Sequence, residues 1–128
     1  MELGYTIFFV PDVVKAIEFY EKAFNLERGF LHEGKDYGEM KTGQTKLCFT
    51  SWDLIKSEKI PFAEHSIKDV PISMEIALVT KDVKKAFAQA VSHGATPVIE
   101  PKQTPWGQEV AYVRDLNGFL IDLCSPMG

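Results

Sequence analysis

The sequence has few cysteines and no long apolar run. Its 128 residues include two cysteines, Cys48 and Cys124, which are too few for the disulfide framework of a small secreted protein. Both lie in apolar, strand-like runs, so we expect reduced, buried thiols. No apolar stretch is long enough to cross a bilayer, and no basic region precedes the apolar residues near the N-terminus. We therefore expect a cytoplasmic protein that does not contact the membrane.

Basic residues are scattered along the chain. The formal net charge is -4, with 14 Lys and Arg against 18 Asp and Glu, and no basic stripe suits nucleic acid. The sequence also lacks a G-x-S-x-G elbow, a phosphate-binding glycine loop, a paired C-x-x-C and an H-E-x-x-H motif. A cysteine nucleophile is not favoured, because no activating base is identifiable for Cys124. These absences argue against the enzyme classes that such motifs identify.

The chain contains two similar halves at an offset of seventy residues. The segment "DVVKAIEFYEKAF" starts at Asp12 and aligns with "DVKKAFAQAVSHG", which starts at Asp82. In both, apolar residues recur at helical spacing. Each aspartate suits a helix N-cap, and Asn25 and Gly94 tolerate the left-handed backbone that often follows a helix. The pattern predicts two amphipathic helices.

Strand-like segments surround both predicted helices. "YTIFFVP" and "EIALVTK" precede them, and three further segments follow in each half, with "KTGQ" and "DLNG" as turns. Each half therefore reads strand, helix, strand, strand, strand. We predict one α+β domain over residues 1–128, with a first module at 1–51, a connection at 52–71 and a second module at 72–128. The connection could be a lid, a linker or a hinge.

A duplicated βαβββ module with "DVVKAIEFYEKAFNLE" and "PWGQEVAYVRDLNGFLIDLCSP" resembles the vicinal-oxygen-chelate superfamily. This group includes glyoxalase I, bleomycin-resistance proteins, fosfomycin-resistance enzymes and extradiol dioxygenases. The resemblance implies an open, cupped mixed sheet with helices on the outside, a ligand cleft and a homodimer. It does not imply one activity, because the superfamily carries unrelated chemistries on this scaffold.

Metal-dependent members of the superfamily bind their ion at four places, on the first and last strands of each module. By resemblance these places fall on Tyr5, on Phe49 or its neighbour Leu47, on Glu75 and on Asp122. Only the two carboxylates are good ligands at neutral pH. We therefore expect no metal cofactor. The alternative is a metal-dependent glyoxalase-like lyase or isomerase, in which Glu75 and Asp122 hold one divalent ion.

Other candidate ligands for a metal are weaker. Glu39, on a middle strand, could supply a third oxygen, although nothing in its spacing requires it. The histidines fall on none of the four positions, and we expect surface or loop roles for His32, His65 and His93. The iron triad of an extradiol dioxygenase has no counterpart.

The remaining candidates suit a small organic ligand. Tyr112 resembles the tyrosine that contacts the drug in fosfomycin-resistance enzymes, and Arg114 could bind an anionic group or pair with Asp122 or Asp115. Trp106 could line the cleft or cap the core. The predicted ligand-binding set is Tyr5, Phe49, Trp106, Tyr112 and Arg114. Glu75 and Asp122 are the candidate catalytic carboxylates, with a solvated sheet face and an interaction module without ligand as the alternatives.

Overall fold

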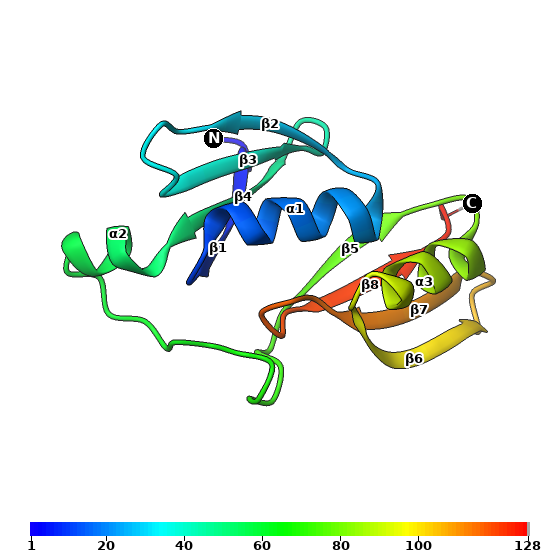
Figure 1. Cartoon of the computed structure of the whole chain (residues 1–128). Helices are drawn as coiled ribbons and strands as arrows, with labels where there is room; N and C mark the ends of the chain where they lie inside the picture. Colours follow the sequence, from blue (N-terminus) through cyan, green and yellow to red (C-terminus); the bar gives the residue numbers. More distant parts are fainter. Residues whose placement is uncertain (128) are drawn as a thin grey trace. The chain divides into compact units, whose positions relative to one another are not determined.

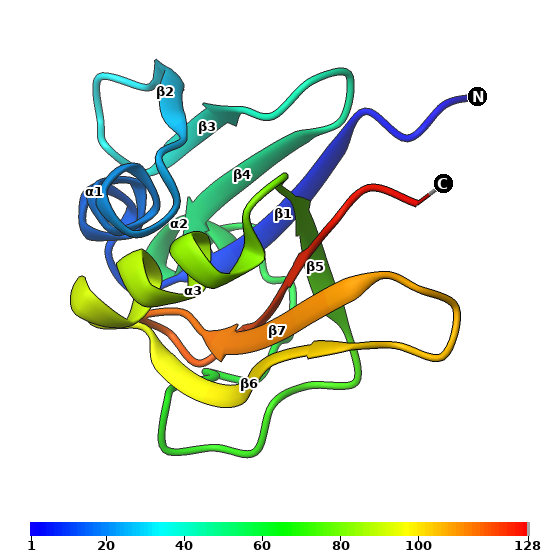
Figure 2. The same cartoon turned by 90° about the vertical axis from the view of Figure 1, so that its right-hand side faces the viewer.

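The computed structural model describes residues 1–127 as two compact units, and the division falls between His65 and Ser66. This boundary lies inside the predicted connection at 52–71. Each unit has its own sheet and its own amphipathic helix (Figures 1 and 2). Among the described residues, no helix is both long and apolar enough to cross a membrane.

The first unit is a four-stranded mixed sheet with two helices. Its elements are β1 (Tyr5–Val10), α1 (Val13–Phe24), β2 (Glu27–Leu31), β3 (Tyr37–Lys41), β4 (Lys46–Ser51) and α2 (Trp52–Ser57). The strand order is β1-β4-β3-β2, with β1 parallel to β4 and the other pairs antiparallel. The short helix α2 was not predicted, because the sequence of the connection has no clear helical period.

The second unit repeats this arrangement. Its elements are β5 (Glu75–Val79), α3 (Val83–Ser92), β6 (Thr96–Gln103), β7 (Glu109–Arg114) and β8 (Leu120–Cys124). The order is β5-β8-β7-β6, with β5 parallel to β8. The predicted α+β class and the βαβββ modules are confirmed, and both sheets are open.

The helix boundaries follow from the predicted caps. The carboxylate of Asp12 accepts a hydrogen bond from the backbone N–H of Lys15 at 3.0 Å, and Asp82 accepts one from Lys85 at 3.0 Å. These bonds satisfy N–H groups that the first helical turn leaves without partners. Helix α1 ends at Asn25, which has a left-handed backbone with φ 56°.

Helix α1 packs closely on β3 because of a glycine. A Cβ atom at Gly38 would lie 2.5 Å from Cδ1 of Ile17. The residues beside it on the same face are therefore in the core, and Met40 is fully buried. Since side chains alternate along a strand, Tyr37 and Glu39 point to the opposite face.

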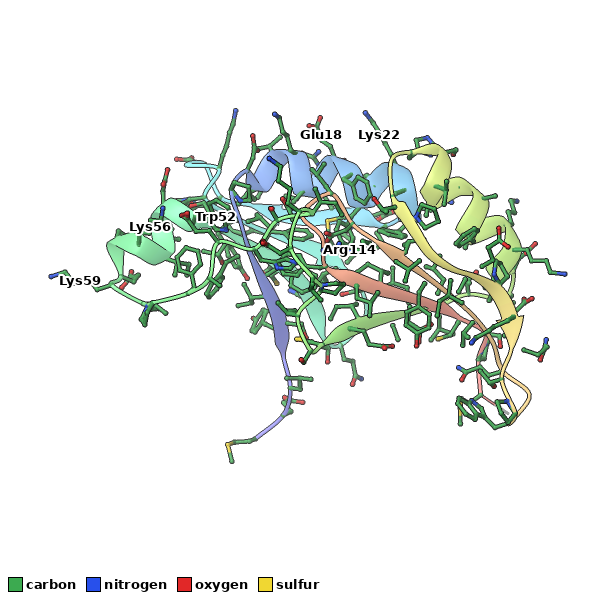
Figure 3. The ribbon with its side chains drawn as sticks, turned by 90° about the horizontal axis from the view of Figure 1, so that it is seen from below. Glu18, Lys22, Trp52, Lys56, Lys59 and Arg114 are labelled. Carbon is green, nitrogen blue, oxygen red and sulfur yellow. The ribbon has the colours of Figure 1, made fainter. Side chains whose placement is uncertain are left out.

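The first part of the connection between the modules is fastened to the first unit. The indole N–H of Trp52 donates to the carbonyl of Phe9 at 3.2 Å, and Phe62 packs edge-on against the Phe9 ring at 5.6 Å. An ion pair of 2.6 Å joins Lys56 to Glu64, and Lys56 lies over Trp52 (Figure 3). These contacts hold residues 52–64 on the first unit.

Candidate functional site

Strand register brings Tyr112, Asp122 and Glu75 together on one face of the second sheet. Tyr112 lies directly opposite Asp122 on β7 and β8. On the other side, Asp122 pairs with Ala77 of β5, and Glu75 lies two residues before Ala77. Tyr112 and Glu75 thus flank Asp122 on the same face.

The opposite face of the same strands forms the core under α3. Ile121 and Leu123, the neighbours of Asp122 on β8, are 0% and 2% exposed. Val113, beside Tyr112 on β7, is also fully buried. The alternation that places these apolar residues beneath α3 requires Asp122 and Tyr112 to face away from it.

Asp122 is a buried acid with an unsatisfied oxygen. It is 8% exposed, and its Oδ1 atom has no hydrogen-bond partner among the described residues. Burial, and then the neighbouring Glu75 carboxyl, raise the pKa of Asp122 from 3.8 to about 6, whereas the Tyr112 hydroxyl lowers it. This carboxyl can therefore gain or lose a proton close to neutral pH.

The pKa values of Tyr112 and Cys124 are raised by the same two acids. Burial and the charges of Asp122 and Glu75 raise the pKa of Tyr112 to about 12. Burial and these two acids also raise the pKa of the Cys124 thiol. At neutral pH the Tyr112 phenol keeps its proton and can donate a hydrogen bond. The cluster thus combines a hydrogen-bond donor, the Tyr112 phenol, with the Asp122 carboxyl, which can gain or lose a proton beside Glu75.

Arg114 lies on this face, but it anchors backbone. Its guanidinium donates to the carbonyl oxygens of Gly118 at 2.9 Å, Ile67 at 3.2 Å and Asp69 at 2.6 Å. These hydrogen bonds favour a structural role for Arg114, and its binding of an anionic group stays a prediction. Each of the three nitrogen atoms donates one hydrogen bond, and together these bonds tie Ile67 and Asp69 to the β7–β8 turn.

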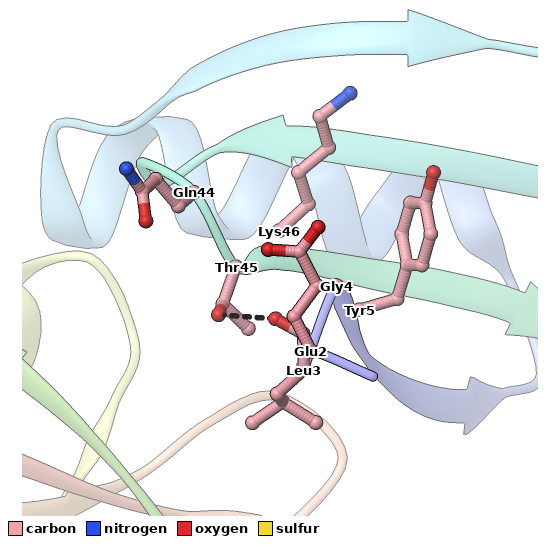
Figure 4. A pocket seen from close by; sticks show the side chains of 7 residues that line it. All are labelled: Glu2, Leu3, Gly4, Tyr5, Gln44, Thr45 and Lys46. Carbon is pink, nitrogen blue, oxygen red and sulfur yellow. Dashed lines mark hydrogen bonds between the residues drawn. The ribbon is translucent and has the colours of Figure 1, made fainter.

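Trp106 is exposed in a turn of the second unit, and Tyr5 belongs to the first unit. Trp106, in the turn before β7, is 67% exposed, and its indole N–H donates to the side chain of Gln108 at 3.0 Å. It therefore does not cap the core. Tyr5 is half-exposed and lines a shallow pocket of the first unit together with Lys46 (Figure 4).

Phe49 is a core residue, which corrects its place in the predicted ligand set. It is fully buried, and its ring centroid lies 5.1 Å from that of Tyr20 on α1. Leu47, two residues earlier, is also buried. The residue between them, Cys48, pairs with Ile7 as Asp122 pairs with Ala77. Cys48 is therefore the true counterpart of Asp122, and sequence analysis missed it.

Residues with metal-binding side chains do not gather into a site. In residues 1–127, no group of three or more His, Cys, Asp or Glu side chains is close enough together to hold a metal ion. His32 hydrogen-bonds to Asp36 at 2.9 Å, and His65 lies in a loop, where it is buried. Glu75 and Asp122 alone are a poor donor set for a divalent ion.

Both cysteines are free and buried, as predicted. Burial raises the pKa of the Cys48 thiol, so neither cysteine has the lowered pKa of a nucleophile.

The comparisons with known proteins agree with this architecture. No curated protein sequence matches the chain significantly. A glyoxalase-related enzyme from Fulvimarina pelagi superposes with a TM-score of 0.82 at 15% identity, covering 98% of this chain and 88% of the other. A protein of unknown function from Agrobacterium tumefaciens gives 0.80 at 18% identity, covering 99% and 95%. At these identities the likeness concerns the fold.

A third structure is a glyoxalase/bleomycin resistance protein/dioxygenase family enzyme from Burkholderia phytofirmans. It superposes with a TM-score of 0.75 at 18% identity and covers 98% of both chains. The family model described as Glyoxalase/Bleomycin resistance protein/Dioxygenase superfamily matches residues 2–123. This match spans both βαβββ modules and nearly the whole chain. The chain therefore belongs to the glyoxalase/bleomycin resistance protein/dioxygenase superfamily.

Proposed function

We propose that this chain binds a small organic molecule on the face of β5, β8 and β7 opposite α3, without a metal ion. The observation that carries the proposal is Asp122, a buried carboxyl whose Oδ1 has no hydrogen-bond partner. A buried carboxyl oxygen without a hydrogen-bond partner destabilises the fold, and such groups are usually kept for a functional reason. A ligand that donates to this oxygen would satisfy it.

The neighbours of Asp122 supply the rest of a binding face. The Tyr112 phenol offers a hydrogen-bond donor and an aromatic surface, and Glu75 offers a second acceptor. Sites for small molecules commonly combine apolar surface with a few convergent polar groups. If the bound molecule also reacts, Asp122 is the group suited to take a proton from it, because its pKa lies near neutral pH.

A metal-dependent lyase or isomerase is the competing account, and metal analysis separates the two. We expect purified protein to carry far less than one divalent ion per chain by plasma mass spectrometry. The matched variants are Asp122→Asn and Glu100→Gln, since Glu100 is exposed on β6. A stoichiometric ion that is lost only in the Asp122 variant would refute metal-free binding.

A thermal-shift screen of apolar and aromatic compounds tests the binding itself. A ligand present at 100 times its Kd stabilises the folded state by about 2.7 kcal/mol, which is easily detected. We expect hits to lose their effect in Asp122→Asn and Tyr112→Phe and to keep it in Glu100→Gln. The homodimer and the cytoplasmic location remain predictions.

A further inference from the structure

In the first unit, the carboxylate of Glu39 forms an ion pair with a lysine of the same sheet. Glu39 on β3 has a side chain that is only 14% exposed, and it accepts a hydrogen bond from the Tyr37 hydroxyl at 2.8 Å. The ammonium group of Lys46 on β4 lies 3.2 Å from its other oxygen. Glu39 in turn raises the pKa of Lys46. This acid is thus paired within its own sheet.

Strand pairing shows which residue of the second unit stands where Lys46 stands in the first. Lys46 is the β4 partner of Tyr5 on β1. Leu120 is the β8 partner of Glu75 on β5. Leu120 therefore takes the position of Lys46, and Glu75 takes that of Tyr5. The second sheet therefore has two acids, Glu75 and Asp122, where the first has Glu39. It has no lysine at the position of Lys46.

No side chain of the second unit replaces the missing cation. The groups that face Asp122 are Glu75 from β5, Tyr112 and Arg114 from β7, and Cys124 on its own strand. Arg114 is the single cation among them, and its guanidinium is committed to backbone carbonyls. Lys102 of β6 lies on this face opposite Val110, but it is exposed and two strands away from Asp122. Among the strand positions next to Asp122 and Glu75 in the second unit, Arg114 is therefore the single cation.

We propose that the ligand of this face is a primary amine, whose ammonium group binds between Glu75 and Asp122 in the place that Lys46 takes in the first unit. This inference rests on the proposed function and specifies its ligand class. An ammonium group has three donors and no acceptor, so it matches the free Oδ1 of Asp122 and the second carboxyl. Leu120 and the Tyr112 ring provide apolar surface for the carbon skeleton of the amine.

Three probes with one ring and different head groups test the ligand class. Benzylamine, benzyl alcohol and benzoate are titrated at pH 7.5 into ¹⁵N-labelled protein, and Kd is obtained from backbone amide shifts. We expect benzylamine to bind at least about tenfold more tightly than benzyl alcohol, with benzoate weakest, because the acid pair attracts a cation and repels an anion. The shifts should centre on Tyr112 and Asp122.

A substitution on the scaffold gives a second test that needs no knowledge of the natural ligand. Leu120→Lys places the cation of the first unit in the second, so benzylamine binding should fall at least about tenfold. Leu120→Met is the matched control and should bind benzylamine like the wild type. Amide spectra establish that both variants are folded, and Asp122→Asn supplies an independent loss of charge if the lysine variant unfolds.

The outcomes separate the two proposals. Benzyl alcohol or benzoate binding at Tyr112 and Asp122 as tightly as benzylamine would overturn the amine inference and leave the proposed function in place. Wild-type affinity for benzylamine in a folded Leu120→Lys or Asp122→Asn protein would also overturn it. If neither these probes nor any compound of the screen shifts the resonances of this face, the proposed function itself fails.

Discussion

Tyr112 and Asp122 lie directly opposite each other on β7 and β8, and their protonation is linked. The phenol lowers the pKa of the carboxyl, whereas burial, and then the negative charge of the carboxyl, raise the pKa of the phenol to about 12. Asp122 is buried and Tyr112 is half-buried on a sheet face that also carries Glu75, and the predictions on binding and pH follow from this pair.

Replacing Asp122 should change how stability depends on pH. The folded-state pKa is about 6, above the ordinary value of 3.8, so the folded protein binds more protons than the unfolded chain between these values. The contribution of Asp122 to the free energy of unfolding is fully present below pH 3.8. It is lost as the pH rises through 6, by up to about 3 kcal/mol. Urea unfolding at pH 5 and pH 8 should show a smaller loss for Asp122→Asn than for wild type.

Glu100→Gln serves as the control for this measurement, because the Glu100 side chain is exposed on β6. Its loss of stability between the two pH values should equal that of the wild type. If Asp122→Asn loses as much stability between pH 5 and pH 8 as the wild type does, the Asp122 carboxyl does not have the raised pKa.

Replacing Tyr112 with phenylalanine should raise the pKa of Asp122 further. The substitution removes the hydroxyl that favours the ionised carboxyl, while the aromatic ring continues to exclude water. A ¹³C NMR titration of the Asp122 carboxyl measures the change directly. An unchanged or lowered value would contradict the contact between the two side chains.

Gly118→Ala should destabilise the protein more than the same change at Gly107. Both glycines have positive φ, 88° and 89°, which costs alanine about 1–2 kcal/mol. At Gly118 the new Cβ would also lie 2.6 Å from Nη2 of Arg114 and 2.7 Å from the carbonyl oxygen of Ser66, whereas Gly107 has open space around it. Denaturant unfolding should therefore give a clearly larger loss for Gly118→Ala, and equal losses would argue against the close approach.

Arg114→Met should loosen the segment that Arg114 holds. Three carbonyl oxygens lose a charged donor, so we expect a destabilisation of about 2–4 kcal/mol and faster hydrogen exchange at residues 66–70. The matched control is Arg28→Met, which removes an exposed ion pair with Glu21 and should cost no more than about 1 kcal/mol. Unchanged exchange at 66–70 would restore Arg114 as a candidate for ligand binding.

The repeated modules were predictable because their signals are local. Helical periodicity, the caps at Asp12 and Asp82 and the glycine turns each depend on a few neighbouring residues, and the structure confirms them. The offset of seventy also places Tyr5 and Glu75 correctly on equivalent first strands.

The last strands were harder to align, because the hairpins before them differ in length. Counting by register, Cys48 matches Asp122 at an offset of 74, whereas the first strands match at 70. A slip of one residue moves a side chain to the other face of a sheet, which is why Phe49 was assigned to the ligand face. The role of Arg114 could not be predicted either, since its partners are backbone carbonyls in a distant loop.

Ligand mapping on metal-free protein tests the central claim most directly. Protein treated with a chelator is titrated with the best compound of the thermal-shift screen. Its ¹H–¹⁵N resonances are followed first without metal and then after adding Zn²⁺. The account predicts shifts centred on Glu75, Tyr112 and Asp122, with an affinity that the metal does not increase. Binding that appears only with a stoichiometric divalent ion, or shifts that leave these three residues unmoved, would contradict it.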